Sequence, residues 1–257
     1  MSEQLYLLTA ADGEAVSETN IGGRSDVLLI CEHASRRLPA RLGSLGLGQA
    51  ALEAHIAWDP GALAVAQRMS SAFDAALIYQ NFSRLAYDCN RPPEAVDAMP
   101  AKSEIYDIPG NAGLSAVDRD ARTHEIYLPF RSAIARRIAE RRAEGRETVL
   151  VTIHSFTPIY RGVSRDVEVG ILHDSDSRLA DQMLTRAETS GRYRVRRNEP
   201  YGPADGVTHT LKEHGLANGL LNVMIEVRND LISDEAGQGV MAGFLAGLIR
   251  ESLAIPA

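Results

Sequence analysis

Residues able to do hydrolytic chemistry directly follow three of the most apolar segments of the sequence. The segments and the reactive residues after them are Val27–Cys31 with His33, Thr148–Ile153 with His154, and Asn222–Ile225 with Glu226. Apolar, β-branched segments of this length are typical of buried strands. If these strands are parallel, their carboxyl ends lie along one edge of a sheet, which is where α/β proteins bind ligands. The sequence therefore predicts that two imidazoles and a carboxylate converge at that edge.

Two imidazoles and a carboxylate suit a catalytic zinc ion. Zinc in hydrolases takes histidine nitrogen and carboxylate oxygen as ligands, keeps one position for water and lowers the pKa of that water. A carboxylate that is not a ligand would serve as the general base. The alternative is structural, because a histidine at a strand end is often a satisfied polar group. The sequence contains no HExxH pair, so spacing alone does not decide between the two interpretations.

A second polar cluster contains Arg84, Asn90 and Arg91. The two guanidinium groups could each bind a carboxylate through parallel hydrogen bonds, and the asparagine could bind a substrate amide. An isolated pair of arginines is more often a surface feature. Here the pair brackets Leu85–Asp88, which we expect to be a buried strand, and a charged group at the end of a buried strand needs a partner. We therefore expect this cluster to bind an anionic substrate.

Asp59 allows two interpretations. It precedes Pro60 and a segment of helical periodicity over 61–73, so it is a plausible helix N-cap. It could also be the third zinc ligand. His55, four residues earlier, is better explained as a polar group outside the ligand set.

Strand-like and helix-like segments alternate along the chain. The expected strands are 27–31, 75–79, 85–88, 148–152, 167–172 and 222–227, and the expected helices are 61–73, 132–142, 177–189 and 240–253. This alternation predicts a three-layer α/β fold, with a mostly parallel or mixed central sheet and helices on both faces. No repeat, low-complexity tract or long linker divides the chain, so we expect a single domain over residues 1–257.

Composition excludes several classes of protein. The 257 residues include 27 Lys and Arg against 34 Asp and Glu, and the net charge of −7 argues against a general nucleic-acid binder. Cys31 and Cys89 lie in apolar segments without CxxC spacing, which is typical of buried, reduced thiols. The first residues lack the basic and apolar regions of a signal peptide, and no apolar stretch approaches the ~20 residues of a membrane span. We therefore expect a cytoplasmic protein with no membrane or nucleic-acid partner.

Five sequence elements together resemble the N-formylglutamate amidohydrolase family. They are Cys31-Glu-His33-Ala-Ser35, His55…Asp59-Pro-Gly-Ala62, Ser83-Arg84…Asp88-Cys-Asn90-Arg91-Pro, His154-Ser-Phe-Thr-Pro158 and Glu226-Val-Arg228-Asn-Asp-Leu-Ile232. The resemblance implies a fold like that of zinc exopeptidases and other phosphorylase/hydrolase-like deacylases. It implies His33 and His154 as zinc ligands, with Asp59 as the candidate for a further ligand. Zinc carboxypeptidases have a glutamate ligand three residues after the first histidine, where this chain has Arg36.

The resemblance also implies the reaction. Glu226 would act as base and then as acid, while Arg84, Asn90, Arg91 and Arg228 would bind the substrate's carboxylates or polarise its acyl carbonyl. The expected activity is zinc-dependent hydrolysis of a small anionic N-acyl amino acid, N-formyl-L-glutamate above all, to formate and glutamate. The alternatives are a deacylase with another acyl or amino-acid preference, or a metal-free protein that binds anionic metabolites.

Overall fold

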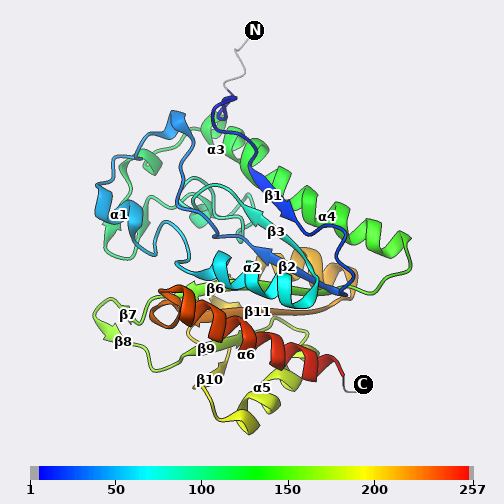
Figure 1. Ribbon diagram of the computed structural model, residues 1–257. Helices are drawn as coiled ribbons and strands as arrows, with labels where there is room; N and C mark the ends of the chain where they lie inside the picture. The colour runs from blue at the N-terminus through cyan, green and yellow to red at the C-terminus, as the bar shows by residue number, and fades with distance from the viewer. Residues whose placement is uncertain (1–5, 255–257) are drawn as a thin grey trace.

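A mixed sheet of seven strands forms the centre of the molecule (Figure 1). The computed structural model describes residues 6–254. In spatial order the strands are β1 (Val16–Thr19), β3 (Ala76–Gln80), β2 (Val27–Cys31), β6 (Val149–Phe156), β11 (Leu221–Arg228), β9 (Val169–Leu172) and β10 (Val195–Arg197). The four central strands, from β3 to β11, run parallel, and β1 and β9 are antiparallel to their inner neighbours. The expected three-layer fold with a mixed sheet is confirmed.

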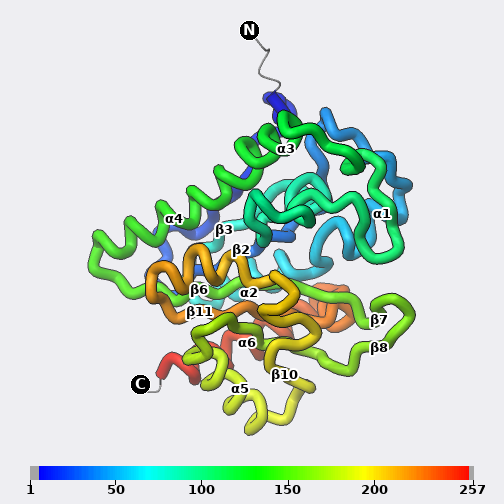
Figure 2. Tube along the Cα trace, turned by 180° about the vertical axis from the view of Figure 1, so that it is seen from behind, coloured from blue at the N-terminus to red at the C-terminus, as the bar shows by residue number. Residues whose placement is uncertain are grey.

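Helices cover both faces of this sheet. The helices are α1 (Gln49–Glu53), α2 (Ala62–Phe73), α3 (Ala116–Arg122), α4 (Leu128–Ala143), α5 (Arg178–Ser190) and α6 (Glu235–Leu253). Leu29 and Cys31 of β2 pack into the core formed with α2, α5 and α6, whereas Leu28 and Ile30 pack into the core that contains α4. Figure 1 shows α2 and α6 side by side on one face, and Figure 2 shows α4 from the other side. The central strands are apolar throughout because both faces are buried.

The parallel strands bring the predicted residues to one edge of the sheet, which we call the carboxyl edge. β6 and β11 pair in register, so that Glu226 lies opposite His154. His33 follows β2, the neighbour of β6 on its other side. Two short hairpins, β4–β5 (Lys102–Ser103 and Tyr106–Asp107) and β7–β8 (Ile159–Tyr160 and Val163–Ser164), are separate from the main sheet. The hairpin β7–β8 lies at the same end of the molecule as α1 in both views (Figures 1 and 2).

The expected strand over Leu85–Asp88 is wrong: this segment is a buried turn. Leu85 and Ala86 are fully buried, but their carbonyl groups accept hydrogen bonds from side chains, at 2.9 Å from Asn111 Nδ2 and 3.2 Å from Arg122 Nη1. A buried segment must satisfy its backbone polar groups, and here side chains replace a neighbouring strand. The apolar sequence therefore reflects burial rather than strand pairing.

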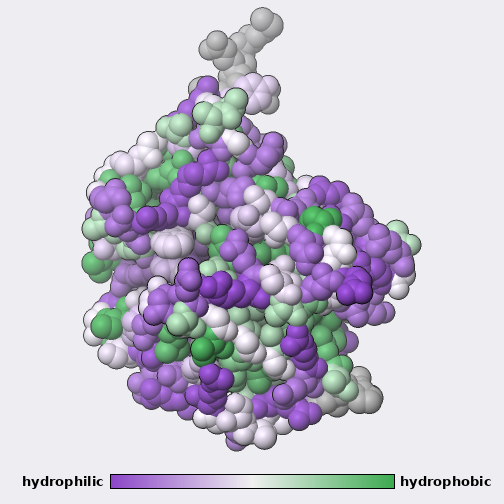
Figure 3. Space-filling view, viewed as in Figure 1, coloured by the Kyte–Doolittle hydropathy of each residue, from purple (hydrophilic) through white to green (hydrophobic). Residues whose placement is uncertain are grey.

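Hydrophilic residues cover most of the face seen in Figure 3, with apolar residues in scattered patches. Within residues 6–254, no helix combines the length and the apolar character that crossing a bilayer requires.

Candidate active site

Three predicted metal ligands converge at the carboxyl edge. His154 Nδ1 lies 3.0 Å and His33 Nδ1 3.3 Å from Asp59 Oδ2, and the two Nδ1 atoms are 3.2 Å apart. All three side chains are buried. Ligand atoms about 2.0 Å from a tetrahedral zinc ion lie roughly 3.3 Å from one another. The spacing of the three donor atoms therefore matches one face of a zinc coordination tetrahedron.

Buried carboxylates hold the outer nitrogens of both histidines. His33 Nε2 lies 2.7 Å from Asp88 Oδ1, and His154 Nε2 lies 3.0 Å from Glu32 Oε2. An ionised carboxylate only accepts hydrogen bonds, so the His33 ring keeps a proton on Nε2 and directs its Nδ1 at the centre. Despite burial, the neighbouring carboxylates raise the pKa of both rings, so a divalent cation that binds the two Nδ1 atoms would compete with protons there. The donor set therefore fits a zinc ion.

Local chain geometry directs Asp59 into this cluster. The predicted alternative, an N-cap role, is wrong, because the N-cap of α2 is Gly61. Only glycine fits at this cap, because Gly61 has φ 81° and the Cβ atom of another residue would lie 2.5 Å from the carbonyl oxygen of Ile232. Asp59 Oδ2 instead accepts a hydrogen bond of 3.1 Å from the backbone N–H of Ser155, at the end of β6. The carboxylate is thus fixed between β6 and the turn before α2.

Arg84 connects the carboxylates around the cluster. Its Nη2 lies 2.6 Å from Asp88 Oδ2 and its Nη1 3.4 Å from Asp59 Oδ1. Burial disfavours the charged form of Asp59, yet His33 and His154 hold its pKa well below the usual range. Burial likewise opposes protonation of His154, but Glu32 and Asp59 outweigh it and raise its pKa. The field at the centre therefore favours positive charge.

Glu226 faces the same cavity without a partner. Its side chain is buried, and Oε2 has no hydrogen-bond partner among the described residues. Burial raises the pKa of Glu226 to about 7. A general base works best when its pKa lies near the operating pH. Glu226 therefore has the free oxygen atom and the proton affinity that such a base needs.

A cavity of about 300 Å³ joins these groups. The predicted residues His33, Asp59, Arg84, Asn90, Arg91, His154 and Glu226 all line it. The side-chain amide of Asn90 holds the loop above, donating to Val207 O at 2.5 Å and accepting from Thr210 N at 3.0 Å. Arg91 Nε donates to Asp97 Oδ2 at 2.7 Å.

Arg228 lies apart from the other predicted residues. It is not among the residues that line the cavity, and its Nε donates to Asp230 Oδ1 at 2.8 Å while its Nη2 lies 3.8 Å from Glu168 Oε1. The prediction that Arg228 binds substrate is therefore not supported by its position outside the cavity lining.

Several residues in or beside the cavity had not been predicted. Glu32 lies behind His154, and the aromatic residues Phe156, Tyr160 and Tyr201 form part of the wall. Glu32 could have been predicted from the sequence, because it directly precedes His33 at the end of the apolar segment. Tyr201 lies in a loop without a recognisable motif, so only the three-dimensional structure brings it to the site.

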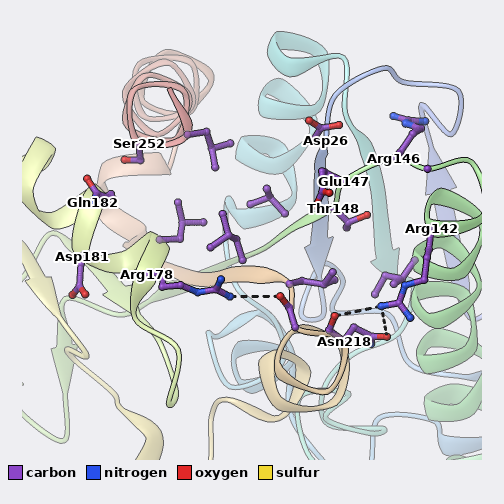
Figure 4. Close-up of a pocket in the computed structure, with 18 residues that line it drawn as sticks. Asp26, Arg142, Arg146, Glu147, Thr148, Arg178, Asp181, Gln182, Asn218 and Ser252 are labelled. Carbon is purple, nitrogen blue, oxygen red and sulfur yellow. Dashed lines mark hydrogen bonds between the residues drawn. The ribbon is translucent and has the colours of Figure 1, made fainter. Parts of the chain in front are cut away.

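A larger groove lies at the opposite edge of the sheet, which we call the amino edge (Figure 4). It has a volume of about 910 Å³ and includes residues at the starts of β6, β11 and α5. Its charged side chains include exposed ones such as Arg142, whose Nη2 donates to Asn218 at 3.3 and 3.4 Å, and Arg178, whose Nη2 lies 2.7 Å from Asp176 Oδ2. Among residues 6–254, the cluster of His33, Asp59 and His154 is the only one with metal-ligating geometry, so the amino edge holds none.

Buried imidazole and carboxylate groups beside a free carboxylate, in one cavity of an α/β fold, define a hydrolytic enzyme. The family model for N-formylglutamate amidohydrolase matches residues 25–233. The chain therefore belongs to the N-formylglutamate amidohydrolase family, and the protein is an amidohydrolase. A search of curated proteins found no match.

Two solved structures resemble this fold over nearly their whole lengths. A gene product of Agrobacterium tumefaciens is 58% identical, with a TM-score of 0.95 over 96% of this chain and 98% of the other. An N-formylglutamate amidohydrolase from Ralstonia eutropha is 17% identical, with a TM-score of 0.62 over 93% of this chain and 97% of the other. The second likeness shows a shared fold.

Proposed function

We propose that the protein hydrolyses the N-acyl amide of an acidic amino acid in a metal-dependent reaction, with N-formyl-L-glutamate as substrate and formate and glutamate as products. One observation carries this proposal: a buried cluster of two Nδ1 atoms and a carboxylate oxygen shares a cavity with the unpaired carboxylate of Glu226. The name of the Ralstonia protein supports the choice of acyl amino acid.

His33, His154 and Asp59 would hold the metal ion, zinc by the chemistry of the donors. When bound, such an ion supplies Lewis-acid polarisation of the acyl carbonyl and lowers the pKa of a water. Asp88 and Glu32 fix the two imidazole rings from outside, so that both Nδ1 atoms remain directed at the centre.

The chain's own groups would move the protons. Glu226, as a carboxylate, takes a proton from the attacking water and later returns it to the nitrogen of the leaving amine. Its pKa of about 7 suits both steps, since neither form is strongly favoured near neutrality. Arg84 lines the cavity with its side chain 28% exposed, so its guanidinium can donate to negative charge on the substrate.

Cavity size and charge agree with a small anionic substrate. A volume of about 300 Å³ suits a metabolite and excludes a folded protein chain. Arg84 and Arg91 line the cavity and offer guanidinium donors to an anionic substrate, in addition to the carboxylates that each already contacts. We also propose a cytoplasmic location, which the buried free cysteines favour because thiols stay reduced in that compartment. We further propose a single domain without nucleic-acid or membrane partners.

The decisive experiment measures formate and amine release from N-formyl, N-acetyl and N-succinyl amino acids by the zinc-reconstituted protein. We expect about one metal ion per chain and the highest kcat/KM with N-formylglutamate. A higher kcat/KM with another acyl group would reassign the substrate but keep the reaction. Failure to retain stoichiometric divalent metal, together with no turnover, would favour a metal-free binding protein.

A further inference from the structure

Arg165, in the loop after β8, carries a charge that no carboxylate neutralises. Its guanidinium carbon lies 4.5 Å from the ring centre of Tyr160, 4.8 Å from that of Tyr201 and 5.7 Å from that of Phe156. No described carboxylate lies within 4.0 Å of its nitrogen atoms, whereas Arg84, Arg91 and Arg228 each have at least one. Aromatic rings stabilise a guanidinium without cancelling its charge. All three rings line the cavity, so the free charge lies directly behind the cavity wall.

The hydrogen bond between Arg165 and Tyr201 has only one possible direction. Arg165 Nη1 lies 3.0 Å from Tyr201 Oη. A guanidinium has no acceptor, so it donates and the hydroxyl oxygen accepts. The hydrogen atom of the Tyr201 hydroxyl therefore remains available to another acceptor. Burial and the charge of Glu226 raise the pKa of Tyr201, which keeps that hydrogen in place near neutral pH.

Two other carboxylates that line the cavity already have partners. Glu104 Oε2 lies 3.2 Å from His55 Nε2, and its Oε1 accepts a hydrogen bond of 3.0 Å from the backbone N–H of Arg161. Asp205 Oδ2 accepts one of 2.8 Å from Gly202 N. Neither carboxylate is among the ion-pair partners of Arg165, so the wall keeps an unmatched positive charge and a free hydroxyl donor.

We infer that the hydroxyl of Tyr201, positioned and backed by Arg165, binds the side-chain carboxylate of the substrate's acidic amino acid. This inference rests on the proposed function and assigns the specificity of the same site. The α-carboxylate is one carbon from the scissile nitrogen, so it must lie near the metal-ligating cluster, where Arg84 contacts Asp59. Arg165 makes no contact with that cluster, so it suits the more distant carboxylate. An O–H donor with a cation behind it makes a short, strong hydrogen bond to a carboxylate.

Two variants test this assignment. Tyr201→Phe removes only the hydroxyl, and Arg165→Gln removes the charge behind it. With N-formylglutamate we expect each to raise KM at least tenfold, with less than a threefold change in kcat. With N-formylglutamine, which has the same shape but no side-chain charge, the loss should be far smaller. The ratio of kcat/KM between the two substrates should therefore fall about tenfold or more.

The chain offers a matched control in a second arginine–tyrosine stack. Arg192 lies 5.6 Å from the ring centre of Tyr193, which packs on Phe244 of α6, outside the cavity lining. Arg192→Gln and Tyr193→Phe should leave the substrate ratio unchanged. Equal losses with both substrates in the Tyr201 and Arg165 variants, or no loss at all, would overturn the inference.

A binding measurement separates this inference from the proposed reaction. Calorimetry on the zinc-loaded protein would compare L-glutamate with L-glutamine, which share the α-carboxylate and differ in the side-chain charge. Preference of the wild type for glutamate, lost in Arg165→Gln, supports the carboxylate site even if no tested amide is hydrolysed. Equal binding of glutamate and glutamine by the wild type would overturn it, even if N-formylglutamate is hydrolysed.

Discussion

The two edges of the central sheet both carry a hollow lined with charged side chains, but they organise those charges differently. At the amino edge, a groove of about 910 Å³ is lined by exposed groups such as Arg142 and Arg178. At the carboxyl edge, a cavity of about 300 Å³ has buried histidines and carboxylates at 2.7 to 3.3 Å from one another. Buried charges that face one another are costly unless a function or a bound ion requires them, so this difference in burial favours the smaller hollow as the active site.

The largest effect should come from Glu226→Gln. Loss of the general base should lower kcat roughly 1000-fold, while the zinc content stays at the wild-type level. Glu147→Gln, in the amino-edge groove, is the matched control and should change kcat less than about twofold. Undiminished turnover by Glu226→Gln would show that proton transfer depends on another group.

Next in size is His154→Ala. One of three ligand atoms is lost, so the affinity for zinc should fall more than about 100-fold, as measured by competition with a chelator. The exposed His124 provides the control, since His124→Ala should bind zinc as the wild type does. Full retention of zinc by the His154 variant would contradict the assignment of this edge as a metal site.

Glu32→Gln should have an intermediate effect. The substituted amide keeps the size of the Glu32 side chain, but it lacks the charge that lies 3.0 Å from His154 Nε2 and makes the imidazole a stronger ligand. We expect the affinity for zinc to fall roughly 10- to 100-fold, by about the amount seen for such outer partners. Asp26→Asn, in the amino-edge groove, should leave the affinity unchanged. An unaltered affinity in Glu32→Gln would mean that Glu32 serves packing alone.

The pH dependence of the reaction should report the burial of Glu226. Its pKa is raised to about 7, so the active carboxylate form increases as the pH rises through 7. Below that value kcat/KM should fall about tenfold per pH unit, and above it the profile should level off. A profile that is flat between pH 5.5 and 8 would contradict this role for Glu226.

The smallest effect is expected for Arg142→Ala at the amino edge. The two long hydrogen bonds to Asn218 contribute little, and the site lies across the sheet from the reaction centre. We expect kcat/KM to stay within about twofold of the wild type. A larger loss would show that the two edges are coupled, and the contrast between them would need revision.

The sequence predicted the fold and most of the site because apolar periodicity and strand ends are local features. Segments such as Val27–Cys31 are strands because both faces are buried, and the residues after parallel strands share one edge. The same local reasoning was wrong for Leu85–Asp88, because its carbonyl groups bond to Asn111 and Arg122, which are distant in the sequence.

Contacts between distant segments also determine the roles of the remaining site residues. Asp59 is a helix cap by its neighbours in the sequence, but the close approach of Ile232 to Gly61 and the N–H of Ser155 give it another role. Arg228 follows Glu226 by two residues, yet it pairs with the local Asp230 and lies 3.8 Å from the distant Glu168. No spacing rule predicts the distant contacts, since they depend on which loops meet in the folded chain.

The pairing of β6 with β11 makes catalysis sensitive to insertions and deletions. Glu226 lies opposite His154 on adjacent hydrogen-bonded strands, whose backbones are about 4.8 Å apart in any sheet. A one-residue deletion within β11 before Glu226 would turn the carboxylate to the face where Val223, Ile225 and Val227 pack in the core. The sheet itself therefore holds the base and this ligand at a constant interval, whatever the length of the chain between the two strands.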